Sequence, residues 1–224
     1  MSTTPVTITE TIAAPSVPTA VITNATRMTV TWTDLSTNET GFKVERLLTP
    51  TVAGATPPVW TTLATVARTG TATTGVNTAV SYIDNLVAPV VQGTYQYRVS
   101  AVNMTGTVVN AASTAIASNV LDFNVPAAPT VLTVTAGAVG SGAVTLGWVD
   151  NATNETGYTI QRATDAKFTK GLVTTAVPGA VTASPVSYLL SGMTAGTKYF
   201  FRVAATNAAG TSAYVASTVA VAVP

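Results

Sequence analysis

The residues best suited to chemistry in this chain are two acidic groups that recur with the same spacing. They are Asp34, Asn38 and Glu39, and, 116 residues later, Asp150, Asn154 and Glu155. Carboxylate and amide oxygens from one loop suit a hard cation such as Ca²⁺. A calcium site needs roughly six oxygen ligands at closer spacing than this, whereas Asp and Asn often stabilise tight loops by bonding to the backbone. We therefore predict a structural role for both loops, with calcium binding as the weaker alternative.

The rest of the composition argues against catalysis. The 224 residues include no Cys and no His, which removes thiolate nucleophiles, the usual general base and the usual zinc and haem ligands. The nine acidic residues include no pair typical of acid–base catalysis. Lys43 follows the first acidic loop, but Thr159 stands in its place after the second. We predict that the protein is not an enzyme and has no cofactor.

Charged residues are few and scattered. They make up 8% of the chain, against about 25% in ordinary globular domains, and leave a net charge of +1. No basic cluster marks a nucleic-acid interface, and apolar runs such as 219–223 fall far short of the roughly 20 residues that span a bilayer. Residues 1–5 lack the features of a signal peptide, so either a signal has been removed or the protein assembles without secretion.

The two acidic loops belong to a duplicated unit. Trp32 precedes the first loop and Trp148 the second, and Tyr95 and Tyr199 each begin a second shared motif, Tyr-x-aromatic-Arg-Val. Self-similarity at this period indicates tandem domains of about 100 residues each. We place the first domain at residues 15–126 and the second at 127–224, after an N-terminal extension at residues 1–14 that can form an extra strand.

The pattern within each repeat is that of β-strands. Met28, Val30 and Trp32 alternate with threonines, as in a half-buried strand. No helical period is sustained, turn residues recur every 8–12 residues, and each repeat accommodates about seven strands, of which the last covers 116–123 in the first repeat and 213–223 in the second. The fold class predicted is all-β, with two tandem immunoglobulin-like antiparallel β-sandwiches.

The alternation also predicts which shared residues build the two cores. All three tryptophans, Trp60 included, fall at phases typical of the core. We expect glycine after each acidic loop to supply the backbone freedom for entering the next strand. The predicted structural core residues are Trp32, Trp148, Tyr95, Tyr199, Gly41 and Gly157.

Two features suggest interfaces. Val6, Ile8 and Ile12 alternate with threonines in the extension, and an exposed strand can pair with a neighbouring chain. The explanation that we favour is that the chain is cut from a longer array of the same unit, because similar Pro-rich joints recur at its ends. Phe200 breaks the alternation of its strand and should point outward, where an aromatic side chain can anchor an interface.

Together these motifs resemble the fibronectin type III family. The resemblance covers residues 15–224 and rests on the early tryptophan, the Gly-aromatic-x-aliphatic of the third strand and the Tyr-x-aromatic-Arg-Val run. It implies that Tyr95 and Tyr199 form the family's tyrosine corner. The Asn-Glu-Thr-Gly loops are similar to those of bacterial members, which are common in secreted multidomain proteins. Residues 86–93 and Met193 depart from the family pattern without affecting the expected fold.

The expected function is therefore that of a non-catalytic structural, spacer and protein-interaction module in a bacterial extracellular or cell-surface protein. Its partners would be other protein domains or copies of itself, with no nucleic acid and no membrane insertion. One alternative is a self-assembling subunit of an extracellular filament or phage particle, joined by the N-terminal strand. A weaker alternative is an accessory module of a polysaccharide-acting enzyme, which predicts an exposed aromatic platform.

Overall fold

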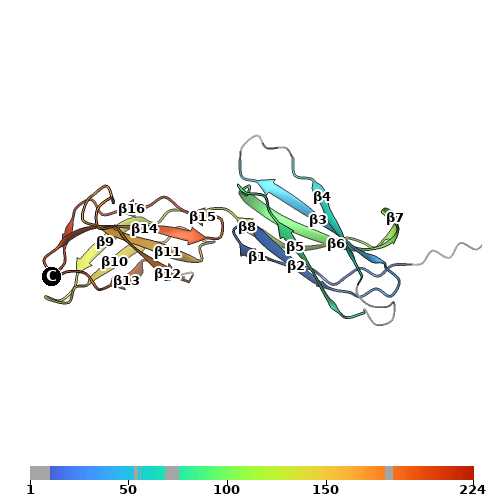
Figure 1. Cartoon of the computed structure of the whole chain (residues 1–224), viewed down its shortest axis with the longest axis horizontal. Coiled ribbons are helices and arrows are strands. Elements are labelled where there is room, and N and C mark those ends of the chain that lie inside the picture. The colour runs from blue at the N-terminus through green and yellow to red at the C-terminus, as the bar shows by residue number, and fades with distance from the viewer. Residues whose placement is uncertain (1–10, 53–54, 56, 69–75, 180–183) are drawn as a thin grey trace, which may run out of the picture. The chain divides into compact units, whose positions relative to one another are not determined.

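The computed structural model describes residues 11–52, 55, 57–68, 76–179 and 184–224. The chain divides into two compact units, Met1–Phe123 (unit 1) and Asn124–Pro224 (unit 2), and the regular elements drawn for both are strands (Figure 1). Among the described residues, no helix is long and apolar enough to cross a membrane. Most of the N-terminal extension, residues 1–10 with Val6 and Ile8, lies outside the described residues, and residues 11–14 are not in a strand.

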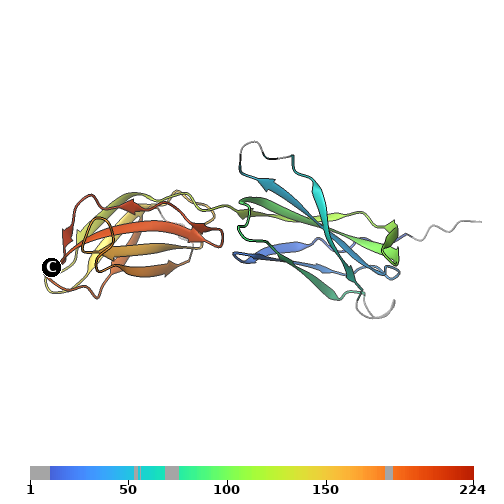
Figure 2. The same cartoon turned by 45° about the horizontal axis from the view of Figure 1, so that its top comes forward.

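Unit 1 is an antiparallel sandwich of two sheets. One sheet has the strand order β1-β2-β5; the other has the order β4-β3-β6-β7, with β8 also paired to β6. Figure 2 shows the two sheets as separate layers, with β1 and β2 in blue and β6 in green. The strands are β1 (Thr19–Asn24), β2 (Arg27–Thr33), β3 (Gly41–Pro50), β4 (Trp60–Ala67), β5 (Ala79–Asn85), β6 (Gly93–Thr105), β7 (Val108–Ala112) and β8 (Ile116–Phe123).

Unit 2 repeats this arrangement with shorter strands. One sheet has the order β13-β10-β9, and the other has the order β12-β11-β14-β15, with β16 and β17 also paired to β14. The all-β prediction of two antiparallel sandwiches is confirmed. The strands are β9 (Thr130–Ala136), β10 (Val144–Val149), β11 (Gly157–Ala163), β12 (Val173–Pro178), β13 (Val186–Leu190), β14 (Lys198–Asn207), β15 (Gly210–Thr211), β16 (Val215–Ala216) and β17 (Val221–Ala222).

The alternating sequence produces the sandwich because each strand buries one face. In β2, Met28, Val30 and Trp32 are at most 3% exposed, while the threonines between them face outward. The third strand of each unit pairs with the long Tyr-containing strand in the same register, Val44 opposite Val99 and Ile160 opposite Val203. Burying these apolar faces between the sheets is the main favourable contribution to folding.

The last strand of unit 2 is not the continuous element predicted for 213–223. Within that range only two short strands form, β16 and β17, and β15 lies before it; serine side chains bond to the backbone of β14 beside them. The backbone N–H groups of Ala205 and Phe201 donate to Ser212 Oγ at 3.0 Å and Ser217 Oγ at 3.1 Å. Unit 1 has the equivalent bonds, from Ala101 to Ser113 Oγ at 3.0 Å and from Tyr97 to Ser118 Oγ at 3.1 Å, and its final strand is likewise preceded by an unpredicted one, β7.

Candidate functional site

In unit 1 the acidic loop joins β2 to β3 and is held by its own hydrogen bonds. Asp34 Oδ1 accepts the backbone N–H of Ser36 at 2.9 Å, which forms the tight turn expected of an aspartate in this position. The Asp34 backbone donates to Thr78 O at 3.0 Å and accepts from Asn77 N at 2.7 Å. Burial raises the pKa of Asp34, although the Ser36 N–H acts in the opposite direction. The first acidic residue is therefore part of the scaffold.

An arginine that the sequence alone does not single out lies at the centre of this loop. Arg68 Nε is 2.9 Å from Glu39 Oε1 and 3.9 Å from Asp34 Oδ2, and the three side chains are 8%, 0% and 1% exposed. The Arg68 N–H also donates to Thr40 O at 3.1 Å, because Arg68 directly follows β4, the partner of β3. One buried guanidinium thus forms an ion pair with Glu39 and a longer one with Asp34, although Arg68 Nε and the Glu39 oxygens do not meet hydrogen-bond geometry.

The loop of unit 2 keeps the turn and lacks the arginine. Asp150 Oδ1 accepts the backbone N–H of Ala152 at 3.0 Å, as Asp34 does from Ser36. Gly179 stands where Arg68 stands in unit 1, because its N–H donates to Thr156 O at 2.9 Å in the equivalent backbone bond. Glu155 is 7% exposed, and its Oε2 atom has no hydrogen-bond partner among the described residues. Glu155 is therefore a buried carboxylate without a counterpart of Arg68 beside it.

A tyrosine hydroxyl lies beside the acids of unit 2 instead. Tyr158 packs against Trp148 with ring centroids 5.1 Å apart, in the position where Phe42 packs against Trp32 at 5.5 Å. Burial, and next the neighbouring Asp150 carboxylate, raise the pKa of Tyr158. Within the described part of the chain, no three acidic, His or Cys side chains are grouped so as to hold a metal ion.

The two amides of the acidic groups also serve the local structure. Asn38 Oδ1 accepts a hydrogen bond from Ser36 Oγ at 3.1 Å in unit 1. In unit 2, Asn154 Nδ2 donates to the backbone carbonyl of Asn124 at 3.0 Å, which fixes the start of the unit against the loop. The arrangement supports loop closure better than ion binding.

The shared core residues lie inside their sandwiches. Trp32, Trp148, Tyr95 and Tyr199 are 3%, 0%, 2% and 7% exposed. The Tyr95 hydroxyl donates to Val91 O at 2.7 Å, which is the hydrogen bond of a tyrosine corner.

The two shared glycines correct the expectation of backbone freedom. Neither Gly41 nor Gly157 has a positive φ angle. A Cβ atom on Gly41 would lie 2.5 Å from Val66 O, and one on Gly157 would lie 2.5 Å from Val177 O. Glycine is therefore required because the neighbouring strand approaches too closely for any side chain.

Trp60 is not a core residue, contrary to its phase in the sequence. The pairing of β3 with β4 shifts register between Val44 and Glu45, and this bulge reverses which face of β4 points inward. Trp60 is half-buried and carries the Arg98 guanidinium over its ring, 4.5 Å from the centroid. The alternation could not predict this, because the bulge depends on the partner strand.

Arg98 and its counterpart Arg202 form a second recurring feature, on the outer faces of the two sandwiches. Arg98 Nε donates to Glu45 Oε2 at 2.8 Å. Arg202 Nε donates to Gln161 Oε1 at 2.8 Å, so a neutral amide replaces the carboxylate. Both arginines stand in the repeated Tyr-x-aromatic-Arg motif, so the sequence does mark them. The other residues of that motif are explained by the fold.

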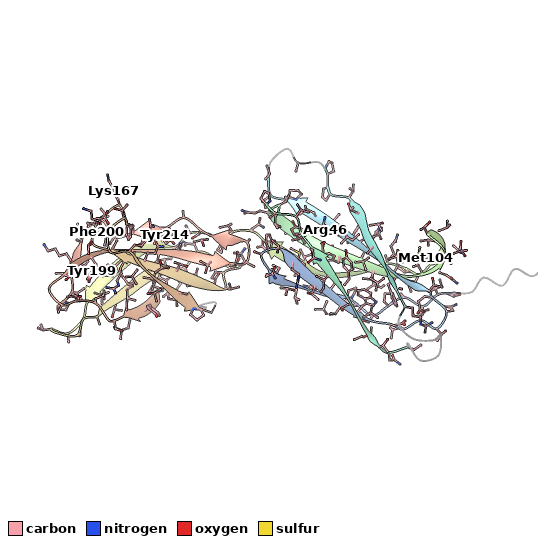
Figure 3. All side chains as sticks on the ribbon, viewed as in Figure 1. Arg46, Met104, Lys167, Tyr199, Phe200 and Tyr214 are labelled. Atoms are coloured by element: carbon pink, nitrogen blue, oxygen red, sulfur yellow. The ribbon has the colours of Figure 1, made fainter. Side chains whose placement is uncertain are left out.

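The residues predicted as interfaces have different surroundings. Ile12 is 8% exposed and therefore buried in unit 1, which does not leave its side chain free for another chain. Phe200 is half-buried on β14, opposite Ala163 of β11. In Figure 3 it lies in the same part of unit 2 as Lys167 and Tyr214.

Comparison with known proteins finds a family similarity in unit 2. The family model of the fibronectin type III domain matches residues 127–220. No curated protein sequence matches the chain.

Solved structures similar to the chain contain fibronectin type III domains. The FN1–FN3 domains of chicken CNTN1 are 20% identical with a TM-score of 0.45, over 94% of this chain and 65% of that one. The fn3 domain of the human collagen alpha-1(XX) chain is 24% identical with a TM-score of 0.36, over 45% of this chain and 89% of that one. A two-domain fibronectin type III segment of chicken tenascin is 10% identical with a TM-score of 0.36, over 93% of this chain and all (100%) of that one. The family match itself is confined to unit 2, between residues 127 and 220.

Proposed function

We propose that the chain is a pair of fibronectin type III sandwiches that serves as a non-catalytic structural, spacer and protein-interaction module. We further propose that it belongs to a bacterial protein of the cell surface or extracellular space. The observation that carries the proposal is the equivalence of the two units. Unit 1 shares with unit 2, whose sequence matches the family, the same central strand pairing and the same pair of serine bonds to the long strand.

A non-catalytic role is supported by the use of the polar side chains. In unit 1, described carboxylates are bound to cations inside the scaffold, as in the pair of Arg46 Nη1 and Asp84 Oδ2 at 2.7 Å. A surface hollow of about 510 Å³ is lined by residues of which none is ionisable: Thr40, Thr65, Ala67, Met104, Gly106 and Thr107. A second hollow, of about 360 Å³, is lined by Arg46 and Asp84, which are already paired with each other. Catalysis by proton transfer needs an ionisable group that is free to exchange its proton in such a cleft.

The composition fits a module that works outside the cell as well as inside it. The absence of cysteine and histidine makes the fold independent of redox conditions and of titration near neutral pH. Only ten Lys and Arg residues offer cleavage sites to trypsin-like proteases. These properties suit a module that holds other domains apart.

Independent folding of the two units tests this proposal. Residues 1–123 and 124–224 should each give, when expressed alone, the dispersed amide spectrum that they give in the full chain. Each should also unfold in a single cooperative transition. An isolated unit that is unfolded would contradict the proposal of two self-sufficient modules.

A further inference from the structure

The two units differ in how their charges are paired. Unit 1 has five cationic and six anionic side chains and unit 2 has five and three, which gives net charges of −1 and +2. All the salt bridges between described residues lie in unit 1. The cations of unit 2 are therefore without carboxylate partners in the described part of the chain.

Four of these cations lie on or beside the outer face of the β11–β14 sheet, together with three aromatic rings. We call this surface the basic face. Its members are Lys167, Lys170, Lys198, Arg202, Phe168, Phe200 and Tyr214. Lys198, Phe200 and Arg202 project outward from β14, because the residues between them are buried. Lys167, Phe200 and Tyr214 are labelled in Figure 3.

Arg202 is held in place from both sides of its strand. Its guanidinium carbon is 4.3 Å from the ring centroids of Phe168, which follows β11, and of Tyr214, which precedes β16. Its Nε is engaged by Gln161, whereas its two terminal nitrogens have no hydrogen-bond partner among the described residues. An immobilised guanidinium with a free fork is suited to binding a carboxylate through two parallel hydrogen bonds.

The loop that carries Phe168, whose ring lies against Arg202, also carries two lysines and uses its own acid internally. Asp165 accepts the N–H of Thr169 at 2.9 Å and that of Lys170 at 2.7 Å. The Lys170 N–H is the main reason that the pKa of Asp165 is lowered. Lys167 and Lys170 are exposed, and neither forms a salt bridge within the described residues. The loop is thus rigidly closed, with its ammonium groups facing solvent.

Unit 1 contains the carboxylate–arginine ion pair that the basic face of unit 2 lacks. In unit 1, Glu45 pairs with Arg98 at 2.8 Å and with Lys43 at 3.3 Å. Gln161 replaces Glu45 in unit 2, since each is paired across the sheet with its arginine. We propose that the basic face of unit 2 binds an acidic segment of a partner protein, whose carboxylates pair with the terminal nitrogens of Arg202 and with the lysines of the face, which have no counterpart of Glu45.

The surroundings favour a protein carboxylate over a sugar or a nucleic acid. Stacking of a sugar or a base needs an open ring face. Phe168 is only 7% exposed, and Arg202 lies against both its ring and that of Tyr214, which leaves the single half-buried ring of Phe200 for stacking. The free groups are cationic nitrogens, and these match carboxylates by charge complementarity. The inference rests on the proposed interaction module and names the chemistry of its partner.

Titration of the full chain with a fluorescent oligoglutamate peptide tests the inference. Binding should weaken as the salt concentration rises to about 0.15 M, where charges are screened beyond roughly 8 Å. Gln161→Glu should weaken binding at least about tenfold, because the new carboxylate would occupy Arg202 as Glu45 occupies Arg98. Thr65→Glu, which adds the same charge at an exposed position of unit 1, should leave binding unchanged.

A second variant, K167Q/K170Q/K198Q, alters only exposed side chains and should also weaken binding. The inference is overturned if oligoglutamate does not bind, or if Gln161→Glu and Thr65→Glu have equal effects. It is also overturned if polygalacturonate or a single-stranded oligonucleotide binds and oligoglutamate does not. In each case the amide spectra of the separate units would still show whether they fold independently, so the proposed function is judged on its own.

Discussion

Units 1 and 2 form the same sandwich but differ in how their charged side chains are paired. In the core of unit 1, Asp84 accepts from Arg46 at 2.7 Å and from the Tyr97 hydroxyl at 2.8 Å. In unit 2 the equivalent positions on the strands hold Leu190 and Phe201. Both cores are closed, so the fold does not require the buried polar network. Replacing such a network by apolar residues of similar volume is often neutral for stability.

The same contrast recurs outside the core. Arg68 between two buried acids becomes Gly179, and the carboxylate of Glu45 becomes the amide of Gln161. In unit 1 the buried carboxylates Glu39, Glu45 and Asp84 each lie against a cation, whereas no salt bridge between described residues occurs in unit 2. The difference indicates that unit 1 is the more self-contained scaffold and that unit 2 is the unit adapted for interaction.

The largest expected effect should be the same in both units, because it concerns what they share. Trp32→Ala and Trp148→Ala each remove a buried ring and should lower the free energy of unfolding by about 3–5 kcal/mol. Urea unfolding of each isolated unit measures the loss. A cost below about 1 kcal/mol for either variant would mean that its tryptophan does not support the core.

The second effect should separate the units. Arg68→Met leaves Glu39 buried without a cation and should cost about 3 kcal/mol. Glu155→Gln in unit 2 removes a buried charge that has no such partner, and it should be neutral or stabilising. The same unfolding experiment compares them. Equal losses would show that Glu155 has a partner of equal strength, and the contrast would then fail.

The core network gives a smaller and non-additive effect. Asp84→Leu alone leaves the buried Tyr97 hydroxyl with only the weak acceptor Met28 Sδ, at 3.1 Å, which should cost about 1–3 kcal/mol. The double variant D84L/Y97F copies unit 2 and should recover most of that loss. A double-mutant cycle measures the recovery, and strictly additive losses would rule out the network as a unit.

The smallest effect concerns the outer ion pair. Burial acts to raise the pKa of Glu45, but hydrogen bonds from Arg98 and Lys43 outweigh it and lower that pKa below the ordinary value of 4.5. The carboxylate therefore stabilises the folded state above that value, and its contribution is lost as the pH falls through the lowered one. Glu45→Gln should cost about 0.5–1 kcal/mol at neutral pH and nothing in acid. A pH series of melting curves tests whether this difference disappears.

The repeat made most of the fold predictable from sequence. Alternation located the strands around Trp32 and Trp148, because each strand exposes one face. The bulge beside Val44, which turns Trp60 outward, depends on the partner strand and leaves no local signal. The repeated serines were a usable signal, since Ser113 and Ser118 in unit 1 and Ser212 and Ser217 in unit 2 are both five residues apart.

The candidate sites were less predictable for the same physical reason. Asp34 and Glu39 are close in sequence, but Arg68, which pairs with them, lies at the end of another strand, β4. The role of Arg202 depends on rings from two separate connections. Composition also conceals the difference between the units, because the net charge of +1 for the whole chain is the sum of −1 for unit 1 and +2 for unit 2.

The most direct test of this account is to exchange the one residue that distinguishes the two outer faces. In the variant E45Q/Q161E, the Arg202 Nε signal in a nitrogen-15 spectrum should no longer shift on addition of oligoglutamate, and the Arg98 Nε signal should begin to shift. Such a transfer would show that carboxylate pairing decides which unit binds. Binding that stays on Arg202 in the exchanged variant would contradict the account.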